Sequence, residues 1–263
     1  YTHYYRLGFL EPVIWSLIRF LHNQSTLNLA TSASMVKALQ RQGIRRVHLW
    51  ERGVDRSQFG PTYKSASMRQ RLSGGKPEKV TFLYVGRLGP EKQLDRLRPL
   101  LDLSPSACLA FVGDGPARPA LEKIFQGTAT TFLGVLHGRP LAEAYASSDV
   151  FIFPSTSETL GLVLMEAMAS GLPIIAADSG PTRELLLDEQ SGQQAELLYD
   201  AADAQQLLAA ARTLLEQPEL RRQLGAQAYR MAENLDWRKP TLQLIQYYNK
   251  AIALHHRYAK SAG

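Results

Sequence analysis

Two glutamates, Glu158 and Glu166, lie in a stretch of the chain whose other residues are mostly apolar. A carboxylate that leaves water costs several kcal/mol unless it is paired or hydrogen-bonded. Two of them at a predicted strand–helix junction call for a ligand that donates hydrogen bonds, as sugar hydroxyls do. Because two vicinal ribose hydroxyls can donate to one carboxylate, Glu166 is the expected ribose ligand, which leaves Glu158 for a hexose. Solvated surface glutamates are the alternative.

A second group of polar residues follows the apolar run that ends at Val85. Gly86 allows close approach of the backbone to a ligand, Arg87 offers a two-pronged donor, and Lys92 offers a point charge. The helix expected directly after them adds amide donors at its N-terminus. This is the chemistry of a diphosphate site, with an ordinary turn and solvated charges as the alternative.

Two further segments could complete a nucleotide site. The amides of Leu160, Gly161 and Leu162 begin a predicted helix and form a second anion site, and the backbone around Gly134 could offer groups to a base. The run 113–116, Gly-Asp-Gly-Pro, is not a dinucleotide fingerprint and is expected to be a tight turn. The sequence has no P-loop, nucleophile elbow or kinase motif, which argues against phosphoryl transfer and serine hydrolysis.

The charge of the chain is unevenly distributed. The net charge is +6, but residues 1–80 hold 13 Lys/Arg and 4 Asp/Glu. This basic front half suggests an anionic partner such as a membrane surface, with a solvated surface as the alternative. We expect no nucleic-acid partner, because no recognised nucleic-acid module is present.

The one cysteine, Cys108, lies in an apolar run and is expected to pack in the core. A single cysteine fits a reducing compartment. Neither a disulfide framework nor a cysteine metal cluster is therefore expected.

Apolar periodicity predicts a doubly wound α/β fold with a parallel sheet covered on both faces. Strands are expected at 27–30, 47–50, 79–85, 107–113, 129–133, 149–153, 172–177 and 195–199. Helices are expected at 10–23, 33–42, 64–72, 91–101, 117–126, 139–147, 161–170, 181–187, 203–215, 218–234 and 239–258. No apolar run reaches the roughly 20 residues of a membrane span. The helix over 10–23 either lies at a membrane interface or packs within its own domain.

Several of these segments together resemble the retaining glycosyltransferases with the GT-B fold. The resemblance rests on Gly86-Arg87 with Glu91-Lys92, on the turn 113–116, and on 155–173, where Ser155, Glu158, Gly161, Glu166-Ala-Met-Ala-Ser-Gly and Pro173 match. Within this family the segments 15–22, 49–55, 143–150 and 157–162 are similar to those of sulfoquinovosyltransferases, which make sulfolipid.

This resemblance implies two Rossmann-like domains, UDP-sulfoquinovose as donor, diacylglycerol as acceptor, retention of the α configuration, and no metal or other cofactor. It also implies a peripheral position on the cytoplasmic or plastid-stromal side of a membrane. Arg87 and Lys92 would bind the diphosphate, Glu166 the ribose and Glu158 the donor sugar. Gly86, Gly134, Leu160, Gly161 and Leu162 would complete the donor site.

The family carries a Gly-rich donor loop and a His-Thr motif in the N-terminal half, and Tyr1 falls just after that place. We therefore expect residues 1–60 to be the remnant of an acceptor domain and 61–78 a linker. Residues 79–236 are the expected nucleotide-sugar domain, and 237–263 a helix that returns towards the N-terminal domain. The alternatives are a mannosyl- or glucosyltransferase of the same fold, with a lipid or soluble acceptor, and a sugar-nucleotide-binding module without turnover.

Overall fold

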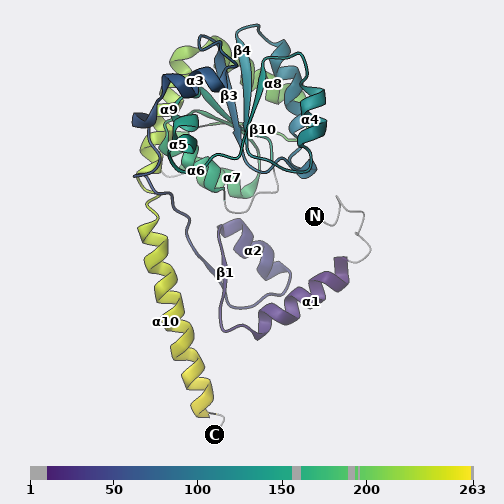
Figure 1. The fold of residues 1–263 in the computed structure, drawn as a ribbon. Coiled ribbons are helices and arrows are strands. Elements are labelled where there is room, and N and C mark those ends of the chain that lie inside the picture. The colour runs from purple at the N-terminus through teal and green to yellow at the C-terminus, as the bar shows by residue number, and fades with distance from the viewer. Residues whose placement is uncertain (1–10, 156–160, 189–192, 195, 262–263) are drawn as a thin grey trace. The chain divides into compact units, whose positions relative to one another are not determined.

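The chain divides into two compact units (Figure 1). The structure is a computed structural model, which describes all residues except 1–10, 156–160, 189–192, 195 and 262–263. The larger unit is Val54–Asp236, and the smaller unit combines Tyr1–Gly53 with Trp237–Gly263. The smaller unit is therefore built from the two ends of the sequence.

The larger unit is built on a six-stranded parallel sheet with the order β10-β7-β6-β3-β4-β5. Its strands are β3 (Val80–Val85), β4 (Ala107–Val112), β5 (Thr130–Gly134), β6 (Val150–Phe153), β7 (Ile174–Ala177) and β10 (Glu196–Tyr199). The chain steps outward from β3 through β4 to β5 and then returns to the other side of β3 with β6. The topological switch point therefore lies between β3 and β6, where ligands of such sheets bind at the carboxyl ends of the strands.

Helices cover both faces of this sheet (Figure 1). They are η2 (Pro61–Tyr63), α3 (Ala66–Leu72), η3 (Pro90–Lys92), η4 (Leu94–Asp102), α4 (Arg118–Ile124), α5 (Gly138–Ala146), α6 (Leu162–Ala169), α7 (Gly180–Leu186), α8 (Ala204–Glu216) and α9 (Pro218–Ala232). Side chains alternate between two cores: Phe82 and Tyr84 pack with η4, α4 and α8, while Leu83 packs with α3, α5, α6, α7 and α9. This arrangement confirms the doubly wound α/β fold.

The predicted helix over 91–101 is wrong in type. The segment is wound as two 3₁₀ helices, η3 and η4, separated by Gln93 at a φ of 51°. Pro99 lies inside η4, and proline lacks the amide that an α-helical hydrogen bond needs. A short antiparallel pair, β8 (Leu187–Asp188) with β9 (Gln193–Gln194), was also not predicted.

The smaller unit is held together around a two-stranded parallel sheet. Its elements are α1 (Glu11–Gln24), β1 (Asn28–Ala30), α2 (Ala33–Arg41), β2 (Val47–Leu49) and α10 (Arg238–Ser261). Helix α10 is tied to the segment after β2, where Trp50 Nε1 donates to the carbonyl of Pro240 at 2.9 Å and Lys239 pairs with Glu51 at 2.7 Å. Among the described residues, no helix is both long and apolar enough to cross a membrane.

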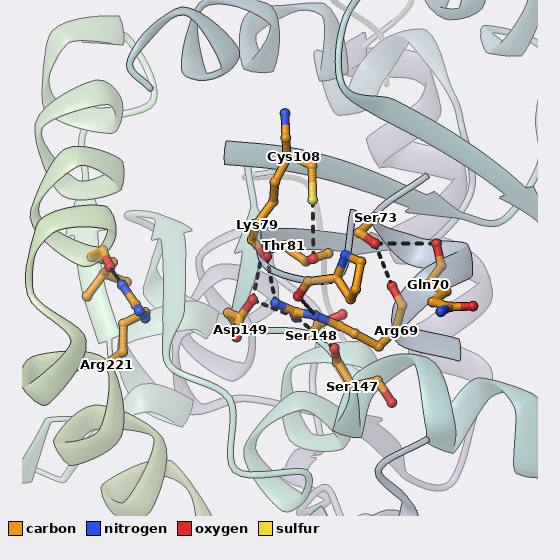
Figure 2. A network of polar contacts seen from close by, with 12 residues as sticks. Arg69, Gln70, Ser73, Lys79, Thr81, Cys108, Ser147, Ser148, Asp149 and Arg221 are labelled. Atoms are coloured by element: carbon orange, nitrogen blue, oxygen red, sulfur yellow. Dashed lines mark hydrogen bonds and ion pairs between the residues drawn. The ribbon is translucent and has the colours of Figure 1, made fainter. Parts of the chain in front are cut away.

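Arg69 of α3 fastens this helix to the amino-terminal edge of the large sheet (Figure 2). Its guanidinium pairs with Asp149 at 2.6 Å and donates to the carbonyls of Pro77, Lys79 and Ser147 at 2.6–2.9 Å. Asp149 in turn accepts from the amide of Thr81 at 2.7 Å. The Thr81 hydroxyl lies 3.2 Å from Cys108 Sγ, which is buried as predicted.

We predict that Arg69→Met lowers the free energy of unfolding by about 2–4 kcal/mol, because it leaves Asp149 without its cation and three carbonyls without their donor. Arg98→Met is the matched control. Arg98 pairs with the well-exposed Asp102, so its loss should cost under about 1 kcal/mol. Urea unfolding of the three proteins gives the comparison, and equal effects of the two variants would contradict a structural role for the Arg69 network.

Candidate functional site

Three glycines end three neighbouring strands at the carboxyl edge of the large sheet. Gly86 follows β3, Gly113 follows β4 and Gly134 ends β5, with φ angles of 152°, 130° and 71°. The amide of Gly86 donates to the carbonyl of Val112 at 3.0 Å, and that of Gly113 donates to the carbonyl of Gly134 at 2.8 Å. The hydrogen bonding between the strands therefore continues into the turns through glycines, which have no side chains.

The turns after β3 and β4 also press against each other. A Cβ on Gly113 would lie 2.0 Å from the carbonyl oxygen of Gly86, and one on Gly115 would lie 2.5 Å from that of Leu88. The amide of Leu88 donates to the carbonyl of Asp114 at 2.9 Å. The run 113–116 is thus a turn, as expected, and it also leaves room for the neighbouring turn that carries Gly86 and Arg87.

A hollow of about 250 Å³ opens above these turns. Its walls are short apolar side chains and glycine backbone, with two charged residues at the side. The lining residues are Val85, Gly86, Arg87, Val112, Gly113, Asp114, Val135 and Leu136. Apolar walls with a few polar groups are typical of small-molecule sites.

The two predicted cations lie on this edge, and each has a protein partner. Arg87 is more than half exposed and pairs with Glu91 at 2.9 Å. The Lys92 ammonium donates to the hydroxyl of Ser155 at 3.3 Å, so a residue that follows β3 meets one that follows β6. Lys92 is therefore held at the switch point. Glu91 reduces the positive charge at Arg87, which the sequence interpretation did not consider.

Helix α6 begins on the other side of the switch point. Gly161 is its N-cap, with a φ of 64° and no side-chain cap, and its carbonyl accepts from the amide of Leu164 at 3.0 Å. Leu162, the first helical residue, is exposed. The amides at the very start of a helix, ahead of that of Leu164 here, have no carbonyl of an earlier turn to donate to, so they suit an anion. Glu158 and Leu160 lie outside the described residues.

Glu166 occupies the second turn of α6, where it is half-buried. The hydroxyl of Tyr145, on α5, donates to Glu166 Oε2 at 2.7 Å. Burial raises the pKa of Glu166, and the hydrogen bond from Tyr145 acts in the opposite direction. Burial and the nearby carboxylate raise the pKa of Tyr145 well above its ordinary value, so the phenol keeps its proton and acts as the donor.

The structure thus brings Gly86, Arg87 and Gly134 to the carboxyl edge of the sheet, where β3, β4 and β5 end. The bond between Lys92 and Ser155 connects this part of the edge to the end of β6. The sequence interpretation missed the parts played by Ser155 and Tyr145. Ser155 carried a signal, since it directly follows an apolar strand. Tyr145 did not, because its partner is 21 residues away on another helix. Within the described part of the chain, no group of three or more His, Cys, Asp and Glu side chains is placed to hold a metal ion.

Two curated relatives are similar to most of this chain. A sulfoquinovosyl transferase of Arabidopsis thaliana, SQD2, is 42% identical over 96% of the chain and 50% of its own length. A GDP-mannose-dependent alpha-mannosyltransferase of Mycobacterium tuberculosis is 41% identical over 72% of the chain and 48% of its own length. The chain spans about half the length of these relatives.

Solved structures of glycosyltransferases share the fold. Anabaena Alr3699/HepE in complex with UDP-glucose superposes with a TM-score of 0.79 at 21% identity, covering 90% of this chain and 67% of that one. Sucrose-phosphate synthase from Thermosynechococcus elongatus gives a TM-score of 0.77 at 24% identity, over 91% and 62%. The large unit and its parallel sheet therefore form the carboxyl-terminal half of a GT-B fold.

Residues 69–231, which include the strands β3 to β10 and the turns of the candidate site, match the family model for group 1 glycosyl transferases. This match spans more than half of the sequence, and it agrees with the fold and with the relatives. The chain belongs to the family of group 1 glycosyl transferases.

Proposed function

We propose that this chain is the donor-binding part of a retaining glycosyltransferase that moves sulfoquinovose from UDP-sulfoquinovose to diacylglycerol. The observation that carries the proposal is the grouping of a glycine-walled hollow, two cations and a half-buried carboxylate around one switch point. These are the partners that a base, a diphosphate and a ribose need. The 42% identity to the Arabidopsis sulfoquinovosyl transferase supports the choice of sugar.

In the proposed complex the base lies in the hollow against the backbone near Gly134, and the ribose hydroxyls donate to Glu166. The diphosphate lies near Arg87, Lys92 and the first amides of α6. Negative charge grows on the diphosphate as the bond to the sugar breaks, and fixed donors aimed at that charge lower the barrier. Glu158 is assigned to the sugar itself. This scheme requires no cofactor and no metal.

A mannosyl transfer is the second candidate, and one observation favours it. The Mycobacterium tuberculosis relative uses GDP-mannose by name and is 41% identical, almost as similar as the plant relative, although over a shorter stretch. The two candidates differ in the base as well as in the sugar. A pyrimidine and a purine make different demands on the hollow at Val135 and Leu136, so nucleotide preference separates them.

The smaller unit is the part of the chain that we propose to meet the lipid acceptor. Its sequence segments hold 12 Lys/Arg and 2 Asp/Glu, so the basic front half and the distant α10 contribute to one positively charged unit. Helix α1 also presents an apolar surface that is more than half exposed, made of Val13, Leu17, Phe20 and Leu21. Basic residues beside an apolar helix face suit the surface of an anionic membrane. We therefore propose a peripheral position at the cytoplasmic or stromal face of a lipid bilayer.

Calorimetric titration with UDP, GDP, UDP-sulfoquinovose, UDP-glucose and GDP-mannose tests the donor. We expect the chain to prefer the uridine nucleotides. Arg87→Ala and Lys92→Ala should each weaken UDP binding by about 1.5–3 kcal/mol, because each removes a charged donor to the diphosphate. Lys123→Ala, at an exposed cation of α4, is the control. A preference for GDP would favour the mannosyl candidate, and unchanged UDP affinity in both site variants would refute the diphosphate assignment.

The two glutamates should differ in the ligand that they affect. Glu166→Ala should weaken UDP itself, because UDP contains the ribose. Glu158→Ala should leave UDP affinity nearly unchanged and impair binding or turnover of the whole sugar nucleotide. The affinities for UDP and for the sugar nucleotide are measured in both variants. Equal effects on UDP would show that the division into a ribose ligand and a hexose ligand is wrong.

The intact protein should bind anionic liposomes reversibly at low salt and leave them at high salt, because screening weakens surface electrostatics. Combining Leu17→Ser with Phe20→Ser should reduce the bound fraction at low salt. Ile124→Ser, at an exposed apolar residue of the larger unit, is the matched control. Flotation through a density gradient reports binding. If the wild type does not float with anionic vesicles at low salt, the acceptor is not reached at such a surface.

A further inference from the structure

The contact between Tyr145 and Glu166 joins a buried donor to a carboxylate at the edge of the site. Tyr145 is fully buried, whereas Glu166 is only half-buried. Among the described residues, Tyr145 is the hydrogen-bond partner of the Glu166 carboxylate, through Oε2 at 2.7 Å. Since a carboxylate has about four acceptor positions, one such bond leaves capacity for further donors from a ligand.

The phenol ring that carries this donor is held in a fixed orientation. Phe59 meets it edge-on, with centroids 5.7 Å apart and planes at 85°, and Phe151 of β6 lies at 5.7 Å with a tilt of 40°. Aromatic pairs in these geometries are attractive beyond their buried area. The ring belongs to the core on this face of the sheet, where packing leaves little freedom to turn. The position of the hydroxyl is therefore set by the core.

A glutamate on a helix surface has three side-chain torsions and samples several rotamers. The bond from Tyr145 holds one oxygen of Glu166 in place and so restricts the planes that the carboxylate can adopt. Two vicinal hydroxyls can donate together only if that plane has a suitable orientation, and a group oriented before binding loses less entropy when the ligand arrives. Tyr145 can thus influence binding without touching the ligand.

We propose that Tyr145 is a positioning residue, which holds the Glu166 carboxylate in the orientation that accepts both ribose hydroxyls of the nucleotide. This inference rests on the proposed function, in which Glu166 binds the ribose. It assigns specificity for the ribose diol to a pair of residues on two helices, one of which never contacts the ligand.

The test compares UDP with 2′,3′-dideoxy-UDP, which lacks both hydroxyls. Calorimetry on the whole chain gives the ratio of the two affinities for the wild type and for Tyr145→Phe, which keeps the packed ring and removes the donor. We expect the wild type to prefer UDP by roughly 100-fold or more, since each of the two hydrogen bonds to a charged group is worth about tenfold or more. Tyr145→Phe should reduce this ratio to about fivefold or less while dideoxy-UDP affinity stays unchanged.

Tyr199→Phe is the matched control, because Tyr199 is another buried tyrosine of the same unit and lies on the opposite core, away from α6. It should keep the wild-type ratio. If Tyr145→Phe also keeps the wild-type ratio, or weakens both ligands equally, the positioning role is overturned. If the wild type itself does not distinguish the two ligands, the ribose assignment of Glu166 fails, and with it that part of the proposed function.

A second variant guards against loss of folding in Tyr145→Phe. Phe59→Leu keeps both polar groups and removes the edge contact that orients the ring at a partly buried position. It should lower the UDP preference to a value between those of the wild type and Tyr145→Phe. An unchanged preference in Phe59→Leu would contradict the claim that the packed ring sets the carboxylate orientation. Thermal unfolding of each variant confirms that the titrated proteins are folded.

Discussion

The close approach of the turns after β3 and β4, at glycines of the second turn, is the constraint on which the site depends. The carbonyl of Gly86 occupies the space where any other residue at position 113 would place its Cβ, 2.0 Å away. A side chain there would push the turns after β3 and β4 apart. That separation would break the bond from Gly86 to Val112, open the floor of the hollow and move Arg87 relative to the neighbouring strands. The glycines thus hold the strand ends together for a ligand.

Much of this fold follows from the sequence because the strands are apolar on both faces. Neighbouring residues such as Phe82 and Leu83 point to opposite faces of the sheet and pack in two different cores. Only a sheet covered on both sides can bury both of these side chains. Periodicity also located the helices, apart from the 3₁₀ winding around Pro99. The glycine turns and the cation Lys92 were recognisable because local chemistry alone marks a strand end followed by a helix.

The contacts that orient the site were not predictable in the same way. Lys92 meets Ser155 across 63 residues of sequence, and Tyr145 meets Glu166 across two helices. Such pairs depend on the order of strands in the sheet and on the rotation of each helix, which no local pattern encodes. The pairing of Arg87 with Glu91 is local, but the sequence left open whether Arg87 would face its neighbour or a ligand.

The charges of the two units are opposite in sign. The smaller unit is strongly basic, whereas the larger unit carries more acidic than basic residues in its sequence. An anionic nucleotide would therefore bind to the unit of net negative charge, so a few fixed cations and amides must act at short range. A lipid surface would meet the basic unit at long range, where salt screens strongly. The two binding events should consequently differ in their sensitivity to ionic strength.

The return of α10 to the first unit has a consequence for the order of folding during synthesis. Domains generally fold as units, beginning with the part that emerges first. Here the first 53 residues lack the helix that contributes Pro240 as acceptor for Trp50 and Tyr247 as donor to Leu49, because residues 238–261 are translated after the entire larger unit. The larger unit can therefore fold on the ribosome before helix α10 of the smaller unit has been synthesised.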